Sequence, residues 1–281
     1  MAENETAPYG TPKAPSRYRT VHLQQAKDEG RHFAMLTAYD FQMAQIFDQA
    51  GIETILVGDS AANNVMGHAT TLPITLDEMI VFASSVVRAA QHAMVVCDLP
   101  FGSYELSPEQ GTASAIRLVK EAGVHAVKME GGSRYAEHIR MMTAAGVPVM
   151  AHIGFTPQSE NVLGGYRVQG RGDDAAARMI QEATALQDAG AFCVLMEMIP
   201  SEVARQVDEA LRVPTIGIGA GNATTGQVLV WQDMLGLRSG KMPRFVKQYA
   251  DLRSVVHDAV TSYVQEVRSG TFPAPEHGFE S

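Results

Sequence analysis

The chain has 281 residues, of which 46% are hydrophobic and 19% are charged, and its net charge is −9. This composition supplies enough apolar side chains for one sizeable core and excludes a disordered chain. The acidic balance, without any Lys/Arg run, argues against a nucleic-acid surface. No apolar run approaches the roughly 20 residues that a membrane helix needs.

The two ends of the chain differ in composition from its middle. Residues 1–16 are polar, contain three prolines and lack the apolar core of a signal peptide. Residues 271–281 are also polar and contain two prolines. We interpret both segments as mobile tails that flank a single domain over residues 17–270.

The two cysteines, Cys97 and Cys193, both lie inside apolar runs. Such a position is typical of a small buried side chain, and two cysteines do not make a disulfide scaffold. This usage suits the reducing cytosol, so we expect a cytoplasmic protein with structural cysteines.

One local pattern recurs along the chain, in which a helical segment ends in Gly and a short apolar run follows. Asp48–Gly51 precedes Thr54–Val57 in this way, and Lys120–Gly123 precedes Ala126–Met129. Gly stops a helix in the left-handed conformation, and a short continuous apolar run indicates a strand buried on both faces. The predicted strands are His32–Tyr39, Thr54–Gly58, Met94–Asp98, Ala126–Glu130, Val149–Ile153, Cys193–Met198, Thr215–Gly219 and an eighth near Val228–Trp231.

Strands that alternate with helices indicate a parallel α/β fold, and eight of them favour a closed (β/α)₈ TIM barrel. A doubly wound open sheet is the main rival, because alternation alone does not show closure. Two helix starts are marked in the sequence. Thr75 stands three residues before Glu78 in a capping-box spacing, and Ser107 precedes Pro108 at a first helical position.

Polar residues lie where five of the predicted strands end, which in a barrel is the face that carries chemistry. They are Asp59 and Ser60, Asp98, Lys128 and Glu130, His152, and Glu197. Each one alone has a structural explanation, such as a helix cap or a loop anchor. Together they bring several carboxylates to one mouth, where they repel each other unless a cation neutralises them. Oxygen ligands of this kind suit Mg²⁺, whereas His152 fits a metal ligand and a hydrogen-bonding pocket residue equally.

Two glycine-rich stretches leave alternatives open. Gly217–Asn222 follows the seventh strand, where barrels often bind phosphate, but a tight turn explains it at least as well. Gly164–Gly172 follows the fifth strand and contains two arginines. It fits a flexible basic lid or a plain surface loop.

Seven short motifs, in order from about residue 20 to about residue 270, together resemble the ketopantoate hydroxymethyltransferase family. They are Thr37–Asp40, Val57–Ser60, Asp98–Phe101, Val127–Gly132, His152–Ser159, Gly164–Gly172 and Gly217–Asn222. The resemblance implies a TIM barrel of the phosphoenolpyruvate/pyruvate superfamily. It also implies a transferase of pantothenate biosynthesis that moves a hydroxymethyl group from 5,10-methylenetetrahydrofolate to 3-methyl-2-oxobutanoate, giving 2-dehydropantoate.

The resemblance also implies roles for individual residues. The family's metal-binding positions fall on Asp59, Asp98 and, more loosely or through water, Glu130. Its substrate-binding positions fall on Asp59, Ser60, Asp98 and Lys128, and its proposed general base falls on Glu197. Members form large rings, so the resemblance implies a homodecamer. The residue types suit a Mg²⁺-stabilised enolate formed from a 2-oxo acid, with His152 as the alternative base.

Two rival functions remain at this point. The first is a magnesium-dependent phosphonomutase or 2-oxo-acid C–C lyase of the same superfamily. Those lyases use a cysteine on a mobile loop, whereas both cysteines here lie in predicted strands. The second rival is a barrel that binds a small acid without turning it over, and carboxylates at several strand ends argue against it.

Overall fold

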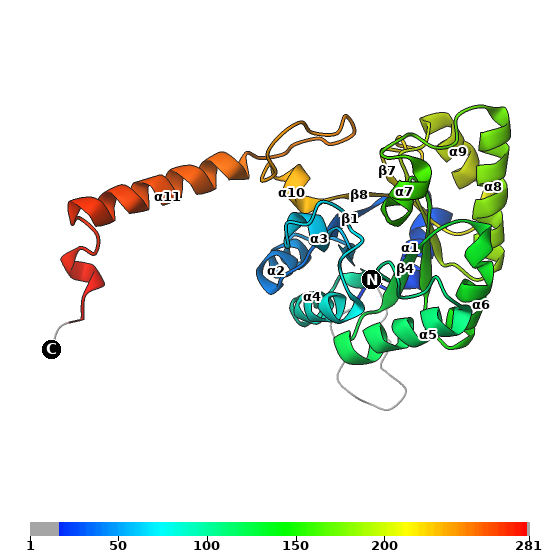
Figure 1. Ribbon diagram of the computed structural model, residues 1–281, viewed down its shortest axis with the longest axis horizontal. Helices are drawn as coiled ribbons and strands as arrows, with labels where there is room; N and C mark the ends of the chain where they lie inside the picture. Colours follow the sequence, from blue (N-terminus) through cyan, green and yellow to red (C-terminus); the bar gives the residue numbers. More distant parts are fainter. Residues whose placement is uncertain (1–16, 280–281) are drawn as a thin grey trace. The chain divides into compact units, whose positions relative to one another are not determined.

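The computed structural model describes residues 17–279. Eight parallel strands form a closed barrel in which each strand pairs with the next and β8 pairs with β1. The helices run around the outside of the strands, as α4, α5, α6 and α8 show in Figure 1. Closure through the β1–β8 pair excludes the open-sheet alternative and confirms the predicted TIM barrel.

The strands lie close to their predicted positions. Their bounds are β1 Phe33–Thr37, β2 Thr54–Val57, β3 Met94–Asp98, β4 Ala126–Glu130, β5 Val149–Gly154, β6 Cys193–Glu197, β7 Thr215–Ile218 and β8 Gly226–Leu229. The eighth strand begins two residues before its predicted start and ends at Leu229 because Trp231 already opens a helix. A Cβ at Gly226 would meet the ring of Phe33, so the closing pair requires glycine here. Gly lowers the strand signal of this segment.

Helices alternate with these strands. The principal ones are α1 Thr20–Asp28, α2 Phe41–Gln49, α3 Ala61–Asn64, α4 Leu76–Ala89, α5 Pro108–Arg117, α6 Ala136–Ala144, α7 Glu160–Leu163, α8 Asp173–Asp188 and α9 Ser201–Ala210. Both predicted helix starts are confirmed. Thr75 and Glu78 form a reciprocal capping box at α4, and the Ser107 hydroxyl accepts a hydrogen bond from the Gln110 amide at α5.

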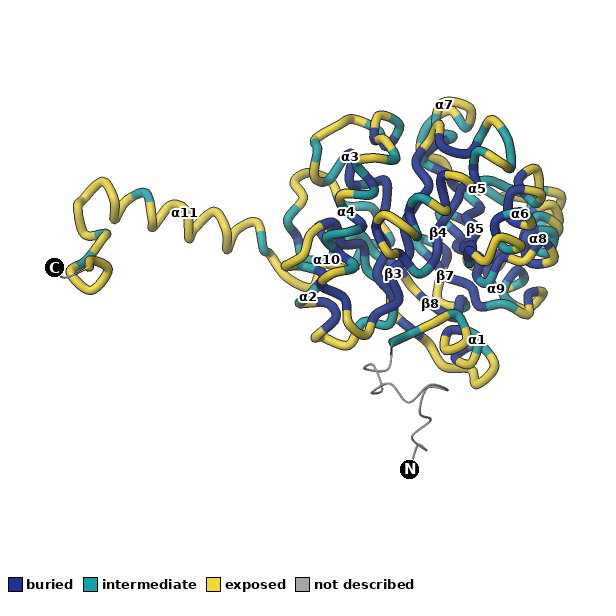
Figure 2. The backbone as a smooth tube through the Cα atoms, turned by 90° about the horizontal axis from the view of Figure 1, so that it is seen from below, coloured by how far each residue is buried: buried dark blue, intermediate teal, exposed yellow. Residues whose placement is uncertain are grey.

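The inside of the barrel is apolar over most of its depth. Alternate strand residues such as Met94, Val96 and Met150 form one buried cluster, and Leu23 and Ala26 of α1 pack against them. Strands place successive side chains on opposite faces, so the same alternation carries the polar residues of the strand ends to the inside. Figure 2 shows the strands as the buried interior and the outer turns of the helices as exposed.

Both cysteines are buried and free. Cys193 points into the barrel as part of the apolar cluster, and Cys97 lies in β3. Burial raises the pKa of each thiol, so neither has the thiolate character of a nucleophile. The prediction that they are buried in strands is confirmed.

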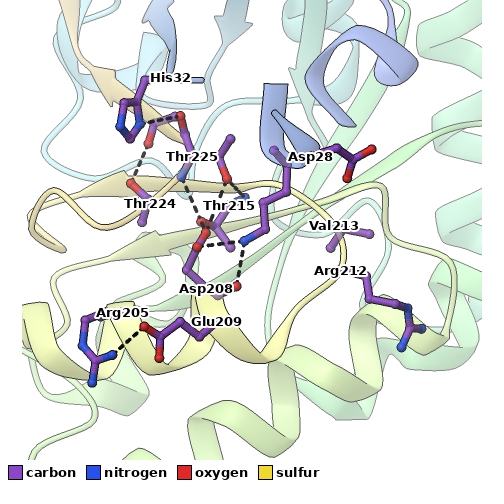
Figure 3. A network of polar contacts seen from close by, with 12 residues as sticks. Asp28, His32, Arg205, Asp208, Glu209, Arg212, Val213, Thr215, Thr224 and Thr225 are labelled. Atoms are coloured by element: carbon purple, nitrogen blue, oxygen red, sulfur yellow. Dashed lines mark hydrogen bonds and ion pairs between the residues drawn. The ribbon is translucent and has the colours of Figure 1, made fainter. Parts of the chain in front are cut away.

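A partly buried carboxylate joins elements at the N-terminal end of the barrel. Asp208 of α9 accepts hydrogen bonds from the hydroxyls of Thr215 and Thr225, which lie at the starts of β7 and β8 (Figure 3). It also forms an ion pair of 2.8 Å with Lys27 of α1. One side chain therefore joins two strands to the helix that closes this end, and polar residues here have a structural role.

The barrel ends at Leu229, and a second compact unit begins at Val230. This unit contains α10 Trp231–Met234, α11 Leu252–Ser269 and the short η4 Pro275–His277. Whether residues 230–270 fold as one domain with the barrel stays a prediction, and the expected tail at residues 1–16 lies outside the described residues. Within residues 17–279, no helix combines the length and the apolar character that crossing a membrane requires.

Candidate active site

The predicted polar residues gather at the C-terminal end of the barrel. Asp98 lies beside Lys128 across β3 and β4, and Glu130 lies beside His152 across β4 and β5. Lys128 and Glu130 are two residues apart, so both face inward from the same strand. Glu197 ends β6. The pairing of the strands therefore places these side chains at the C-terminal end of the barrel, beyond its apolar layers.

Lys128 is the cation at the centre of this group. Its ammonium lies 2.7 Å from Asp98 Oδ1 and 3.7 Å from Glu130 Oε1, and its side chain is 4% exposed. Burial alone would lower the pKa of Lys128, but the charges of Asp98, Glu130 and Asp59 raise it above its ordinary value. Lys128 is therefore a permanent positive charge in the site.

Asp59 and Asp98 are adjacent buried carboxylates. The backbone amide of Asp59 donates to Asp98 Oδ2 over 3.0 Å. Burial and the charges of Asp98 and Glu130 raise the pKa of Asp59 well above its ordinary value. Burial also raises the pKa of Asp98, although Lys128 opposes this shift. The single ammonium of Lys128 can therefore balance only one of these two carboxylates when both are ionised.

Glu130 and Glu197 lie on either side of His152. The Nδ1 atom of His152 is 3.3 Å from Glu130 Oε1, and its Nε2 atom is 3.5 Å from Glu197 Oε2. Burial and Lys128 oppose protonation of the ring, yet the two carboxylates raise the pKa of His152. Burial opposes ionisation of Glu130, but His152, Lys128 and a backbone amide hold its pKa below the ordinary value. Glu130 and His152 are therefore each already in contact with other polar groups of the protein.

Glu197 differs from the other carboxylates in its access to the mouth. Its side chain is 16% exposed, whereas those of Asp98 and Glu130 are 3% and 2% exposed. The next residue, Met198, has a φ of 48°, a conformation that bulky residues rarely adopt. Its amide donates to Ile218 and its carbonyl accepts from Gln169, both over 2.9 Å. Neighbouring segments thus hold the strained turn that follows Glu197.

Ser60 lies beside a tyrosine to which sequence reasoning gave no role. The Tyr39 hydroxyl and Ser60 Oγ are 2.9 Å apart. Burial raises the pKa of Tyr39 to about 12, so its hydroxyl keeps its proton near neutral pH. Tyr39 stood in a motif of the resemblance, but only the fold shows what it contacts.

Gln158 is the other residue that sequence reasoning missed. Its side-chain amide donates to Asp59 Oδ2 over 2.8 Å, and its backbone amide donates to Glu130 Oε2 over 2.9 Å. The Tyr104 hydroxyl donates to Gln158 Oε1 over 2.6 Å. Gln158 is only 6% exposed. A glutamine in a short segment after a strand carries no signal of such contacts in the sequence.

The glycine-rich stretches take different forms. After β7, Gly219 and Gly221 have positive φ, and a Cβ at Gly221 would meet Ser201 of α9. A tight turn against a helix therefore accounts for these glycines. In the other stretch, the ring of Tyr166 stacks on Phe155 with centroids 4.6 Å apart. Whether this second stretch moves as a lid stays a prediction.

Comparison with known proteins bears on this arrangement. The family model for ketopantoate hydroxymethyltransferase matches residues 17–275. The chain belongs to this family. It is 62% identical to 3-methyl-2-oxobutanoate hydroxymethyltransferase of Paenarthrobacter aurescens, covering 97% of this chain and 95% of that protein. Proteins of the same name from Nocardioides sp. and Mycobacterium marinum are each 58% identical and cover 99% and 98% of this chain, with 98% and 92% of their own lengths matched.

Solved structures with the same fold are more distant in sequence. Phosphonopyruvate hydrolase, in a complex with oxalate and Mg++, is 14% identical with a TM-score of 0.61, over 94% of this chain and 92% of its own. A 2,3-dimethylmalate lyase of the PEP mutase/isocitrate lyase superfamily is 18% identical with a TM-score of 0.57, over 92% of both chains. These likenesses confirm the expected barrel fold.

Replacement of Lys128 tests the charge balance of the site. Lys128→Met leaves buried carboxylates without their ammonium, so the free energy of unfolding of the metal-free protein should fall by about 3–5 kcal/mol. Without Lys128 the folded-state pKa values of the neighbouring carboxyl groups rise, because a positive charge that favours their ionised form is gone. Stability from a group with a raised pKa is lost as pH rises, so the deficit should be larger at about pH 8 than at about pH 5.

Urea unfolding at both pH values measures this deficit. Lys120→Met removes an exposed lysine and is the matched control, expected within about 0.5 kcal/mol of the parent protein. A deficit for Lys128→Met that is no larger than that of the control, or that shrinks as pH rises, would contradict the assignment.

Proposed function

We propose that the protein transfers a hydroxymethyl group from 5,10-methylenetetrahydrofolate to 3-methyl-2-oxobutanoate and forms 2-dehydropantoate, the committed step of pantothenate biosynthesis. Identities of 55–62% to proteins named 3-methyl-2-oxobutanoate hydroxymethyltransferase, over nearly the whole chain, carry this proposal. The cluster at the C-terminal end of the barrel supplies the charges and acid–base groups that the reaction needs.

The donor set at the mouth fits Mg²⁺ held by Asp59 and Asp98. Their carboxylates are buried beside each other, and of the two only Asp98 forms an ion pair with Lys128. Among residues 17–279, no three or more His, Cys, Asp or Glu side chains have the geometry to hold a metal. Mg²⁺ suits such a site because it keeps several waters and takes one or two protein carboxylates.

Glu130 fits a looser role toward the metal. One of its oxygens faces His152 and the other accepts a hydrogen bond from the Gln158 amide. Contact with the metal through a water molecule would leave both of these interactions in place. When bound, the cation supplies positive charge that favours negative charge on the oxygens of a 2-oxo acid. Lys128 and Ser60 are proposed to hold the same substrate oxygens.

Glu197 is the proposed general base. It is the carboxylate of the cluster with the most exposed side chain, and a base must reach the proton that it removes. The C3–H bond of the substrate breaks, the proton goes to Glu197, and the electron pair forms the enolate. C3 then attacks the methylene carbon of the folate, both C–N bonds of the methylene bridge break, and one water supplies the hydroxyl oxygen. Tetrahydrofolate leaves with two new N–H bonds, one proton coming from C3 through Glu197 and the other from the water. His152 is the weaker candidate, because each of its ring nitrogens faces a carboxylate.

The superfamily rivals find less support. The chain belongs to the transferase family, and the phosphonomutase-like and lyase-like structures share only its fold. Both cysteines are buried in strands, so neither can act as the loop cysteine of a C–C lyase. Their free thiols also suit the cytoplasm as the site of function.

A homodecamer is proposed as the assembly. Helix α11 has no buried residue, and Val256, Val260, Tyr263 and Val267 expose 46–56% of their surface. These residues recur at helical spacing and form an apolar stripe. In a monomeric protein such a stripe is usually packed against the core. Further copies of this chain are the proposed cover.

A single reaction tests the proposed activity. Purified protein with Mg²⁺, 3-methyl-2-oxobutanoate and methylenetetrahydrofolate should form 2-dehydropantoate, detected by mass spectrometry. EDTA should abolish the product, and Mg²⁺ or Mn²⁺ should restore it, because the paired carboxylates require a hard cation. Asp98→Asn should lose metal affinity by about tenfold or more. Full turnover by metal-free protein would refute the metal assignment, and no product with metal present would refute the reaction.

Deuterium exchange tests Glu197 apart from folate chemistry. In D₂O without folate, the protein should exchange the C3 hydrogen of 3-methyl-2-oxobutanoate. Glu197→Gln should lose this exchange by about 10²-fold or more, the usual contribution of a positioned base. Glu202→Gln removes an exposed carboxylate on α9 and should exchange at the parent rate. Normal exchange by Glu197→Gln together with loss in His152→Asn would make His152 the base.

Light scattering tests the assembly. The parent protein should have the mass of about ten chains, and Val260→Lys should reduce it by placing a charge in the apolar stripe. Ser262→Lys adds the same charge on the opposite face of α11 and should leave the mass unchanged. A monomeric parent protein, or equal masses for the two variants, would contradict the proposed role of the stripe.

A further inference from the structure

Gln158 contacts two of the three carboxylates of the proposed metal site, Asp59 and Glu130. It follows β5 in the short η3 helix Pro157–Ser159. Its side-chain amide donates to Asp59 Oδ2, and its backbone amide donates to Glu130 Oε2. One residue therefore fixes an oxygen of each carboxylate from a segment that belongs to neither of their strands.

The orientation of the Gln158 amide follows from its partners. Nε2 faces two acceptors, Asp59 Oδ2 at 2.8 Å and the Leu99 carbonyl at 3.0 Å. Oε1 faces the Tyr104 hydroxyl at 2.6 Å. A flipped amide would set oxygen against two acceptors, so the network admits one orientation. Tyr104 is itself held in place, because the residue is 2% exposed, its ring packs edge-on against Tyr135, and its hydroxyl also lies 3.2 Å from the Glu130 carbonyl.

We propose that Gln158, held by Tyr104, is a positioning residue that sets the metal-binding geometry of Asp59. Its hydrogen bond takes Oδ2 of Asp59 and leaves Oδ1 for the cation. A neutral amide suits this task. A lysine here would neutralise Asp59 and compete with the metal, and a glutamate would add a further negative charge to a cluster that already lacks positive charge.

The same residue limits repulsion between the carboxylates. Asp59 and Glu130 are both buried, and each accepts one hydrogen bond from Gln158. Hydrogen bonds from Gln158 to both disperse their charge while no metal is bound. This inference rests on the proposed role of Asp59 as a metal ligand, but it concerns metal affinity and not the reaction.

Mn²⁺ binding, followed by electron paramagnetic resonance without substrate, tests the proposal. Gln158→Leu should weaken Mn²⁺ binding by about tenfold or more, the usual effect of losing a partner of a metal ligand. Tyr104→Phe keeps the Gln158 amide but removes its anchor, and should weaken binding by a smaller factor. If Gln158→Leu does not fold, the Kd of Tyr104→Phe decides the question.

Gln187→Leu is the matched control. Gln187 is a buried glutamine at the other end of the barrel, where its side chain accepts hydrogen bonds from the amides of Arg212 and Val213. It should lose thermal stability comparably and keep the parent Mn²⁺ affinity. Parent-like affinity in Gln158→Leu and Tyr104→Phe, an equal loss in Gln187→Leu, or no Mn²⁺ binding by the parent protein would each overturn the proposal. Tight Mn²⁺ binding without formation of 2-dehydropantoate would instead refute only the proposed function.

Discussion

The burial of Lys128 among three carboxylates is the interaction on which the site depends. Its ammonium lies 2.7 Å from Asp98 and 3.7 Å from Glu130, in a position almost without solvent. Buried charges are costly unless they are paired, and here the pairing is unequal because Asp59 remains without an opposite charge. That imbalance destabilises the cluster on its own, and the proposed Mg²⁺ would neutralise it.

The barrel makes this unequal arrangement tolerable. Below the charged residues, alternate side chains from all eight strands form an apolar cluster, closed at the lower end by Leu23 and Ala26 of α1. Asp208 ties that end together through Lys27 and two threonines. Stability therefore comes from the lower layers, and the upper layer is free to carry charges that oppose folding.

Residues outside the strands orient the site. Gln158 fixes Asp59 and Glu130, Tyr104 fixes Gln158, and the strained turn at Met198 follows Glu197. Each acts by holding another group and has no charge of its own. The proposed ligands and base thus lie on rigid strand ends, while neutral loop residues restrict their orientation.

The sequence by itself determined the alternation of strands and helices, and it identified the charged residues at the strand ends. Short apolar runs, several of them preceded by a glycine that ends a helix, are local signals, so β3 and β4 were predicted at their observed bounds. It did not show closure, because the β1–β8 pair joins residues nearly 200 positions apart and its Gly226 weakens the local strand pattern. Nor did it show the contacts of Gln158, Tyr104 and Tyr39. A hydrogen bond between loop residues depends on where the folded chain brings them, and only the tertiary structure decides that.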